Sequence, residues 1–131
     1  MKEQVLTISQ MQELIDMGVD VSKASMCWSK FKNDPDFSLQ AMSQDAFEEQ
    51  IRSIDTLYTP YDYYIIPTFT FQDMLEMLSQ GSLRGSLHFN KNKFIVFMAD
   101  NQFNVINETD SVSSIEAVFK MLKWCKENKY V

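Results

Sequence analysis

Glycine and proline are scarce in this chain of 131 residues, with three of each, and histidine occurs once. Phosphate-binding loops need several glycines close together, so the supply of glycine argues against a nucleotide-binding loop. A single histidine, His88, argues against histidine-rich metal sites and leaves any nucleophile–histidine arrangement dependent on one residue. The sequence contains no Walker, G-x-G-x-x-G, G-x-S-x-G or H-E-x-x-H motif. We therefore expect no cofactor, no metal and no catalytic residue.

Cysteines and long apolar runs are also few. Cys27 and Cys125 lie far apart in the sequence and form no C-x-x-C motif, so we expect two buried thiols in a reducing compartment. The longest apolar run, residues 94–99, has the length of a strand, whereas a membrane-spanning helix needs about 20 apolar residues. The first residues show no unbroken apolar segment of the kind a signal peptide contains. We expect a cytoplasmic protein without a membrane segment.

The residues that are present favour a globular protein. Ten phenylalanines, five tyrosines and two tryptophans distinguish the composition from that of disordered chains. The length suits one domain without a disulfide or metal staple, so we expect a single α+β domain over residues 1–131. The net charge is −6, but residues 1–80 hold 13 acidic and 5 basic side chains, whereas residues 81–131 hold 5 acidic and 7 basic ones. The acidic balance disfavours nonspecific binding to nucleic acid.

Capping signals predict the helices. Three positions in the sequence match the pattern of an N-terminal cap, in which a serine or threonine is followed three residues later by a polar partner. These pairs are Thr7 and Gln10, Thr70 and Asp73, and Ser113 and Glu116. Gly18 and Gly81 end the first and third helices, and the last helix spans 114–127 with an apolar stripe. A further helix starts near Ser43, and its expected apolar face consists of Ala46, Phe47, Ile51 and Ile54.

Alternating apolar residues predict the strands. They cover residues 24–28, 37–42, 63–66, 86–89, 94–98 and 103–106. Pro67 is expected to stop the third of these, and Asp100-Asn101 to form a two-residue turn between the last two. Residues 56–62 are expected to form a loop. Helices and strands do not alternate regularly, so the sequence predicts an α+β fold with an antiparallel sheet. The sheet includes a hairpin in the C-terminal half, about four helices pack on it, and the chain ends in an amphipathic helix.

A cluster of tyrosines is the first candidate binding feature. Four of the five tyrosines, Tyr58, Tyr61, Tyr63 and Tyr64, fall within seven residues, where a loop enters a strand. Tyrosine combines a large contact area with a polar tip and is enriched at binding hot spots. These residues are therefore candidates for contact with a partner. The alternative is that the rings cover the edge of the domain's own core.

A row of lysines on the last helix is the second candidate. Lys120, Lys123 and Lys126 are expected on its outer face, where they could contact nucleic acid or simply be solvated. Carboxylates near Asp45 or His88 leave a third possibility open, a small enzyme that uses a carboxylate or histidine site. For Asp45 and Glu49 the alternative is a solvated helix face, and for His88 a surface imidazole.

Several segments resemble a family of small uncharacterised proteins from gut bacterial genomes and their mobile elements or prophages. The matching stretches are residues 5–8, 18–20, 22–28, 66–73 and 121–125. The resemblance implies a bacterial or phage-derived origin and no known activity. Residues 86–127, with strands followed by a helix that opens on Ser113-Ser114-Ile115, are also similar in order to HicB-type antitoxins, although the first half departs from that pattern.

Together these features predict a non-enzymatic protein with an accessory or regulatory role. We expect it to bind a protein partner or to self-associate. Nucleic-acid binding, as a weakly antitoxin-like regulator that uses the basic face of the last helix, is the first alternative. A small enzyme is the second.

Overall fold

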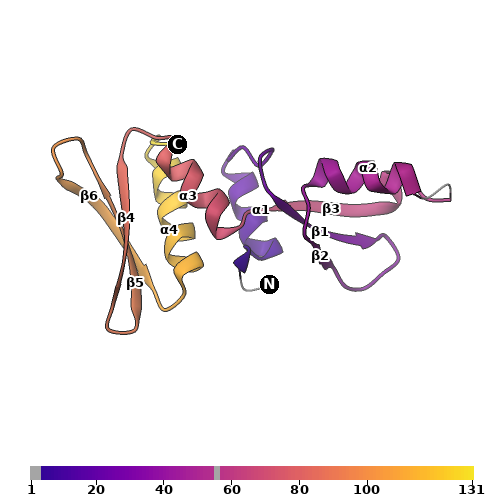
Figure 1. The fold of residues 1–131 in the computed structure, drawn as a ribbon, viewed down its shortest axis with the longest axis horizontal. Helices are drawn as coiled ribbons and strands as arrows, with labels where there is room; N and C mark the ends of the chain where they lie inside the picture. The colour runs from indigo at the N-terminus through magenta and orange to yellow at the C-terminus, as the bar shows by residue number, and fades with distance from the viewer. Residues whose placement is uncertain (1–3, 55–56) are drawn as a thin grey trace. The chain divides into compact units, whose positions relative to one another are not determined.

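The computed structural model describes residues 4–54 and 57–131 (Figure 1). The chain divides into two compact units, residues 1–70 and 71–131. Each unit contains a three-stranded antiparallel sheet and two α-helices. The expected α+β class and the C-terminal helix are therefore confirmed, with the strands shared between two sheets. The assignment of residues 1–131 to one domain stays a prediction.

The first unit opens with helix α1 (Ile8–Asp16), which begins with the expected capping box. The Thr7 hydroxyl accepts a hydrogen bond from the Gln10 amide at 3.1 Å, and the Gln10 side chain accepts one from the Thr7 amide at 2.9 Å. Gly18 follows the helix with a φ of 83°, a left-handed conformation that costs glycine little. The capping signals therefore define both ends of this helix.

The sheet of the first unit has the strand order β2-β1-β3, with β1 (Met26–Phe31) in the centre. β2 (Ser38–Gln40) is short, and β3 (Tyr63–Thr68) pairs with β1 over its whole length. Helix α2 (Gln44–Ile54) supplies Phe47 and Ile51, which cluster with Cys27 on one face. On the other face Val5, Met26 and Trp28 form a second cluster. The core of this unit therefore lies on both sides of β1.

Two details of the first unit differ from the sequence prediction. Pro67 does not stop β3 but pairs with Cys27 inside it. The Lys32 amide donates to the Asp62 carbonyl, which shows that these two residues form a hydrogen-bonded pair between β1 and β3. In an antiparallel ladder, hydrogen-bonded and non-hydrogen-bonded pairs alternate, so Pro67 belongs to a non-hydrogen-bonded pair. Its backbone nitrogen therefore faces the open edge of the sheet, where no bond within the sheet needs an N–H. In α2, only Phe47 and Ile51 of the four expected apolar positions are buried, whereas Ala46 and Ile54 are exposed.

The predicted loop of residues 56–62 is also described only in part. Its first residue, Thr56, lies outside the described residues. The rest includes a short 3-10 helix, η2 (Pro60–Asp62), directly before β3. Proline at the first helical position fixes φ at a helical value, which favours this turn.

The second unit consists of α3 (Phe71–Ser79), β4 (Arg84–Asn90), β5 (Lys93–Ala99), β6 (Val105–Ser111) and α4 (Ser114–Glu127). Its strand order is β4-β5-β6. Val96 and Met98 of β5 are buried on the face that α4 covers, and Thr109 of β6 donates to the Ala117 carbonyl of α4 at 2.7 Å. Figure 1 shows α3 and α4 on the same side of this sheet. The opposite face carries no helix of this unit.

One turn of the second sheet was not predicted, and the other differs from the prediction. Lys91 and Asn92 join β4 to β5 in a two-residue turn, and both have positive φ, at 49° and 67°. Asp100-Asn101 is part of a longer loop, so β6 begins at Val105 rather than at Phe103. The Asp100 carboxylate organises this loop by accepting hydrogen bonds from the Gln102 and Asn104 amides, both at 2.9 Å.

Gly81 follows α3 as expected, but for a different reason from Gly18. Gly18 is the glycine with a positive φ among the described residues. At Gly81 a Cβ atom would lie 2.5 Å from the Tyr130 carbonyl oxygen, closer than a real contact allows. Glycine is therefore required here by the space available.

Candidate functional site

The tyrosine cluster is divided by the structure into inward and outward members. Tyr63 stacks on Phe31, with ring centroids 4.3 Å apart, and meets Phe47 of α2 edge-on at 5.6 Å. Tyr58 contacts the same Phe31 ring edge-on at 5.0 Å. Tyr63 therefore extends the core on the α2 side of the sheet, as the alternative interpretation expects, whereas Tyr58 contacts Phe31 and stays 43% exposed.

Tyr64 lies on the opposite face of the sheet, because side chains alternate along β3. Its ring is half exposed, at 50%. The ammonium groups of Lys30 and Lys32 lie 5.5 Å and 5.8 Å from its centroid, within the range of cation–π attraction. Lys30 also donates to the Asp34 carbonyl at 2.8 Å. Tyr64 is therefore part of a small basic and aromatic surface rather than of the core.

Tyr61 is the most exposed of the four, at 85% of its surface. It lies in η2, which is in contact with α2. Ile54, the last residue of α2, is 73% exposed, and Leu57 is 84% exposed. We call Ile54, Leu57, Tyr58 and Tyr61 the tyrosine end. Sequence reasoning found its two tyrosines but missed Ile54 and Leu57, because a helical stripe does not show where the supporting sheet stops.

The backbone around Tyr61 is held by several hydrogen bonds. The Asp62 carboxylate accepts from the Thr59 amide at 2.7 Å, and the Asp62 amide donates to the Thr59 carbonyl at 3.0 Å. Pro60 adds a fixed φ at the first position of η2. An exposed ring on a restrained turn loses little conformational entropy when it binds, which is a property of binding residues.

Two of the three candidate lysines of α4 have partners within the second unit. Lys120 Nζ donates to the Asp110 carbonyl oxygen at 2.9 Å, and Lys123 Nζ lies 5.3 Å from the Phe119 ring centroid. Lys126 lies in the last turn of the helix, where a cation is favoured by the helix dipole. These contacts give the lysines a structural role within the second unit. Nucleic-acid binding by the lysines stays a prediction.

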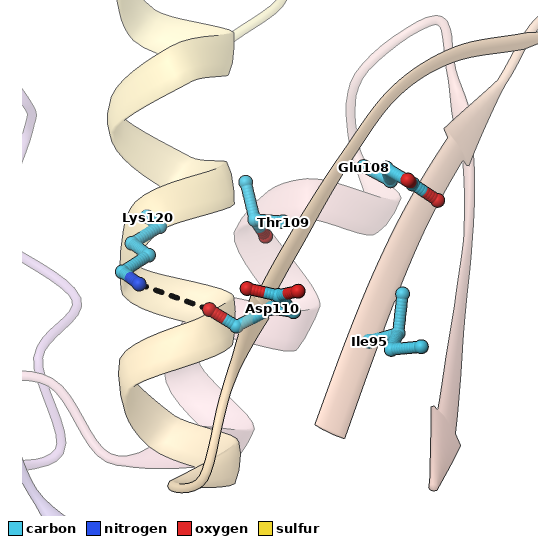
Figure 2. A pocket seen from close by; sticks show the side chains of 5 residues that line it. All are labelled: Ile95, Glu108, Thr109, Asp110 and Lys120. Carbon is cyan, nitrogen blue, oxygen red and sulfur yellow. Dashed lines mark hydrogen bonds between the residues drawn. The ribbon is translucent and has the colours of Figure 1, made fainter. Parts of the chain in front are cut away.

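A hollow of about 270 Å³ lies beside β6 (Figure 2). It is lined by Ile95 of β5, by Glu108, Thr109 and Asp110 of β6, and by Lys120 of α4. Lys93 Nζ lies 3.7 Å from the Asp110 carboxylate, in an exposed ion pair. The lining combines charges of both signs, Lys120 already donates to the Asp110 main-chain carbonyl, and neither His88 nor Asp45 is included. This geometry does not bring the residues of the enzyme alternative together.

His88 and the carboxylates of α2 lie on surfaces. His88 is exposed on β4, where its ring contacts Phe97 edge-on at 5.2 Å and its Nε2 lies 3.2 Å from the Ser86 hydroxyl. Asp45 and Glu49 are exposed, and Glu48 pairs with Arg52 at 3.9 Å. Within residues 4–54 and 57–131, no group of three or more histidine, cysteine, aspartate or glutamate side chains could hold a metal ion.

Both cysteines are buried and free. Burial raises the pKa of the Cys27 thiol to about 11, and the nearby charge of Glu48 adds to this rise. Burial also raises the pKa of the Cys125 thiol to about 11. A thiol with so high a pKa carries little thiolate at neutral pH and is therefore unreactive.

Comparison with protein-family models gives no match, and comparison with curated proteins and with solved structures gives none either. None of the helices in the described part of the chain has the length and apolar composition needed to cross a bilayer.

Proposed function

We propose that this protein is a non-enzymatic binding protein that contacts another protein through the tyrosine end. The observation that carries the proposal is the exposure of Ile54, Leu57 and Tyr61, each by more than 70%. Large apolar side chains at the surface are normal when they are scattered, but several at one place mark interaction sites. Such contact would cover these side chains and release the water around them.

Two further observations support the proposal. Tyr61 combines an apolar ring with a hydroxyl that can form hydrogen bonds at the rim of an interface. The turn that carries Tyr61 is restrained by Asp62 and Pro60, so the backbone that presents this ring needs little ordering when a partner binds. Part of the cluster, Tyr63, supports the surface from inside through Phe31 and Phe47.

The biological setting is part of the same proposal. The sequence resemblance to proteins of gut bacteria and their mobile elements suggests an accessory or regulatory factor of bacterial origin. Two free, unreactive thiols are compatible with a cytoplasmic location, where disulfides are rare.

A quantitative pull-down tests this proposal. Tagged wild-type protein, a double variant with Leu57→Ser and Tyr61→Ala, and a control with Val112→Ser would be compared in bacterial lysate with and without nuclease. Val112 is a suitable control because it is an exposed apolar residue of the second unit, at 77%. We expect a stoichiometric protein that the control retains, the double variant loses and nuclease does not affect. Equal recovery by all three proteins would contradict the proposed surface, and nuclease-sensitive recovery would favour nucleic acid.

A further inference from the structure

The outer edge of β4 is open to pairing with another strand. β4 pairs with β5 on one side and forms the end of its sheet. We propose that this edge binds an extended segment of a partner protein in which apolar residues alternate with acidic ones. The segment would add a fourth strand to the sheet. The proposal concerns a surface other than the tyrosine end and does not depend on it.

The two-residue turn fixes which backbone groups face outward. Asn90 and Lys93 flank the turn at Lys91-Asn92 and form the closing hydrogen-bonded pair of the hairpin. Antiparallel bonding alternates, so Ser86 and His88 also bond to β5. The N–H and C=O groups of Gly85, Leu87 and Phe89 therefore point away from the sheet. These three residues offer the main-chain groups that strand addition uses.

The side chains along this edge are exposed. All seven residues of β4 are exposed, including Phe89 at 66% and Leu87 at 39%. These two share the sheet face of Val96 and Phe94, their partners on β5, and the rings of Phe89 and Phe94 lie 4.9 Å apart. Exposed apolar residues on an open edge strand are a template for pairing with another chain.

Other edges in the described part of the chain carry features that hinder pairing. β3 contains Pro67, which has no N–H to offer, and β2 is three residues long. At β6, Lys120 donates to the Asp110 carbonyl, which the same alternation directs outward. Short strands, prolines and lysines are the usual means by which proteins protect sheet edges. β4 has seven residues and none of these features.

The charge around β4 specifies an acidic partner. Residues 81–99 include Arg84, Lys91 and Lys93 and no acidic side chain, in a chain with a net charge of −6. Lys93 already pairs with Asp110 of β6, so Arg84 and Lys91 carry the charge that favours an acidic segment. Arg84 and His88 lie on the face opposite Leu87 and Phe89, because side chains alternate along a strand. An added strand would therefore place acidic side chains beside Arg84 and apolar ones beside Leu87. Opposite charges on neighbouring strands are stabilising.

Gly85 adds a preference for a large side chain in the partner. It lies on the same face as Leu87 and Phe89 and leaves that position of β4 without a side chain. Aromatic residues cover such glycines well when they lie opposite them on a neighbouring strand. The partner residue opposite Gly85 is therefore expected to be aromatic.

Two synthetic peptides test the proposal with the full chain. One alternates apolar residues with glutamate, and the other has lysine in place of each glutamate. We expect the glutamate peptide to bind at least ~10-fold more tightly, with a preference that shrinks as salt increases. In NMR spectra of the labelled protein, the amide shifts should be largest at Gly85, Leu87 and Phe89.

Matched variants complete the test. Leu87→Pro removes an outward N–H that no intrasheet bond uses, and should abolish binding. Arg84→Gln should reduce the preference for glutamate, whereas Lys23→Gln, an equal change of charge in the first unit, should not. The tyrosine-end double variant should bind the peptide normally. Equal affinity for both peptides, or shifts at other residues, would overturn the proposal. Self-association without peptide that shifts the same three amides would assign the edge to a second copy of the chain and overturn it too.

Discussion

Trp28 donates its indole N–H to the carbonyl oxygen of Leu6 at 3.0 Å, in the interior of the first unit. The hydroxyl of Thr68 donates to the same oxygen at 2.8 Å. One carbonyl therefore joins the segment before α1 to the two long strands of the sheet. A buried carbonyl that loses all its donors costs more than the loss of one bond, because it has also left water.

This arrangement predicts a non-additive effect. Thr68→Val should lower the free energy of unfolding by about 1 kcal/mol, and Trp28→Phe by somewhat more because it also loses packing. Each single variant leaves the Leu6 carbonyl oxygen with one hydrogen-bond donor. The double variant should therefore lose on the order of 1 kcal/mol of unfolding free energy beyond the sum of the two single losses. Urea denaturation of the four proteins measures this difference. Additivity within about 0.5 kcal/mol would show that the two donors act independently.

The two classes of tyrosine should respond differently to substitution. Tyr63→Ala removes ring contacts with Phe31 and Phe47 and should cost about 2 kcal/mol of stability. Tyr61→Ala should change stability by less than about 0.5 kcal/mol, because its ring is exposed. Thermal and urea unfolding check both. A large destabilisation by Tyr61→Ala would mean that the ring supports the fold, and its use as a binding residue would lose its main argument.

Two glycines of the second unit provide a steric comparison. At Gly81 an added methyl group meets the backbone oxygen of Tyr130, whereas at Gly85 it meets the Met98 sulfur at 3.1 Å, on a flexible side chain. Gly81→Ala should therefore destabilise by about 1–3 kcal/mol, as overpacking does, and Gly85→Ala should be close to neutral. The Gly81 variant should also alter Trp124 fluorescence, because Tyr130 stacks on that indole at 5.4 Å. Equal effects at both positions would contradict this account.

The buried thiols predict a loss of stability at alkaline pH. Each folded-state pKa is raised from 9.0 to about 11, so the folded protein holds these protons more tightly than the unfolded chain. The associated stability is complete below pH 9 and is lost as the pH rises toward 11, by about 2 kcal/mol per thiol. Lysines and tyrosines titrate in the same range, so Cys125→Ala is compared with wild type. Between pH 8 and 11 the free energy of unfolding of the variant should decrease by about 2 kcal/mol less than that of the wild type. Parallel curves would mean that the thiol is not the cause.

Nucleic-acid binding by the lysines of α4 can be separated from protein binding. The leading proposal expects no salt-dependent affinity for DNA or RNA. If binding does occur, the logarithm of the association constant should fall linearly with the logarithm of the salt concentration, because phosphate contacts release counterions. Lys126→Gln and Lys120→Gln should then each reduce that slope by about one. This result in a fluorescence anisotropy titration would replace the leading proposal with the regulator alternative.

Local signals in the sequence determined much of the secondary structure. The Thr7–Gln10 capping box and Gly18 define α1, and Ser113 with the apolar stripe defines α4. These features depend on residues within one or two helical turns, so the sequence contains the whole cause. The lack of a glycine-rich phosphate-binding motif can also be read from the sequence, which has three glycines.

Tertiary structure decided which side chains are covered. Pro67 remains in β3 because that strand is at an edge, and Ile54 is exposed although it fits the apolar stripe of α2. Tyr63 and Tyr64 are neighbours in sequence, yet one is packed against α2 and the other lies on the opposite face. Burial depends on which element lies against each face, and on where a sheet ends. Those contacts join residues distant in sequence, so the sequence determined the elements of this protein and only the assembled fold determined which side chains its surfaces expose.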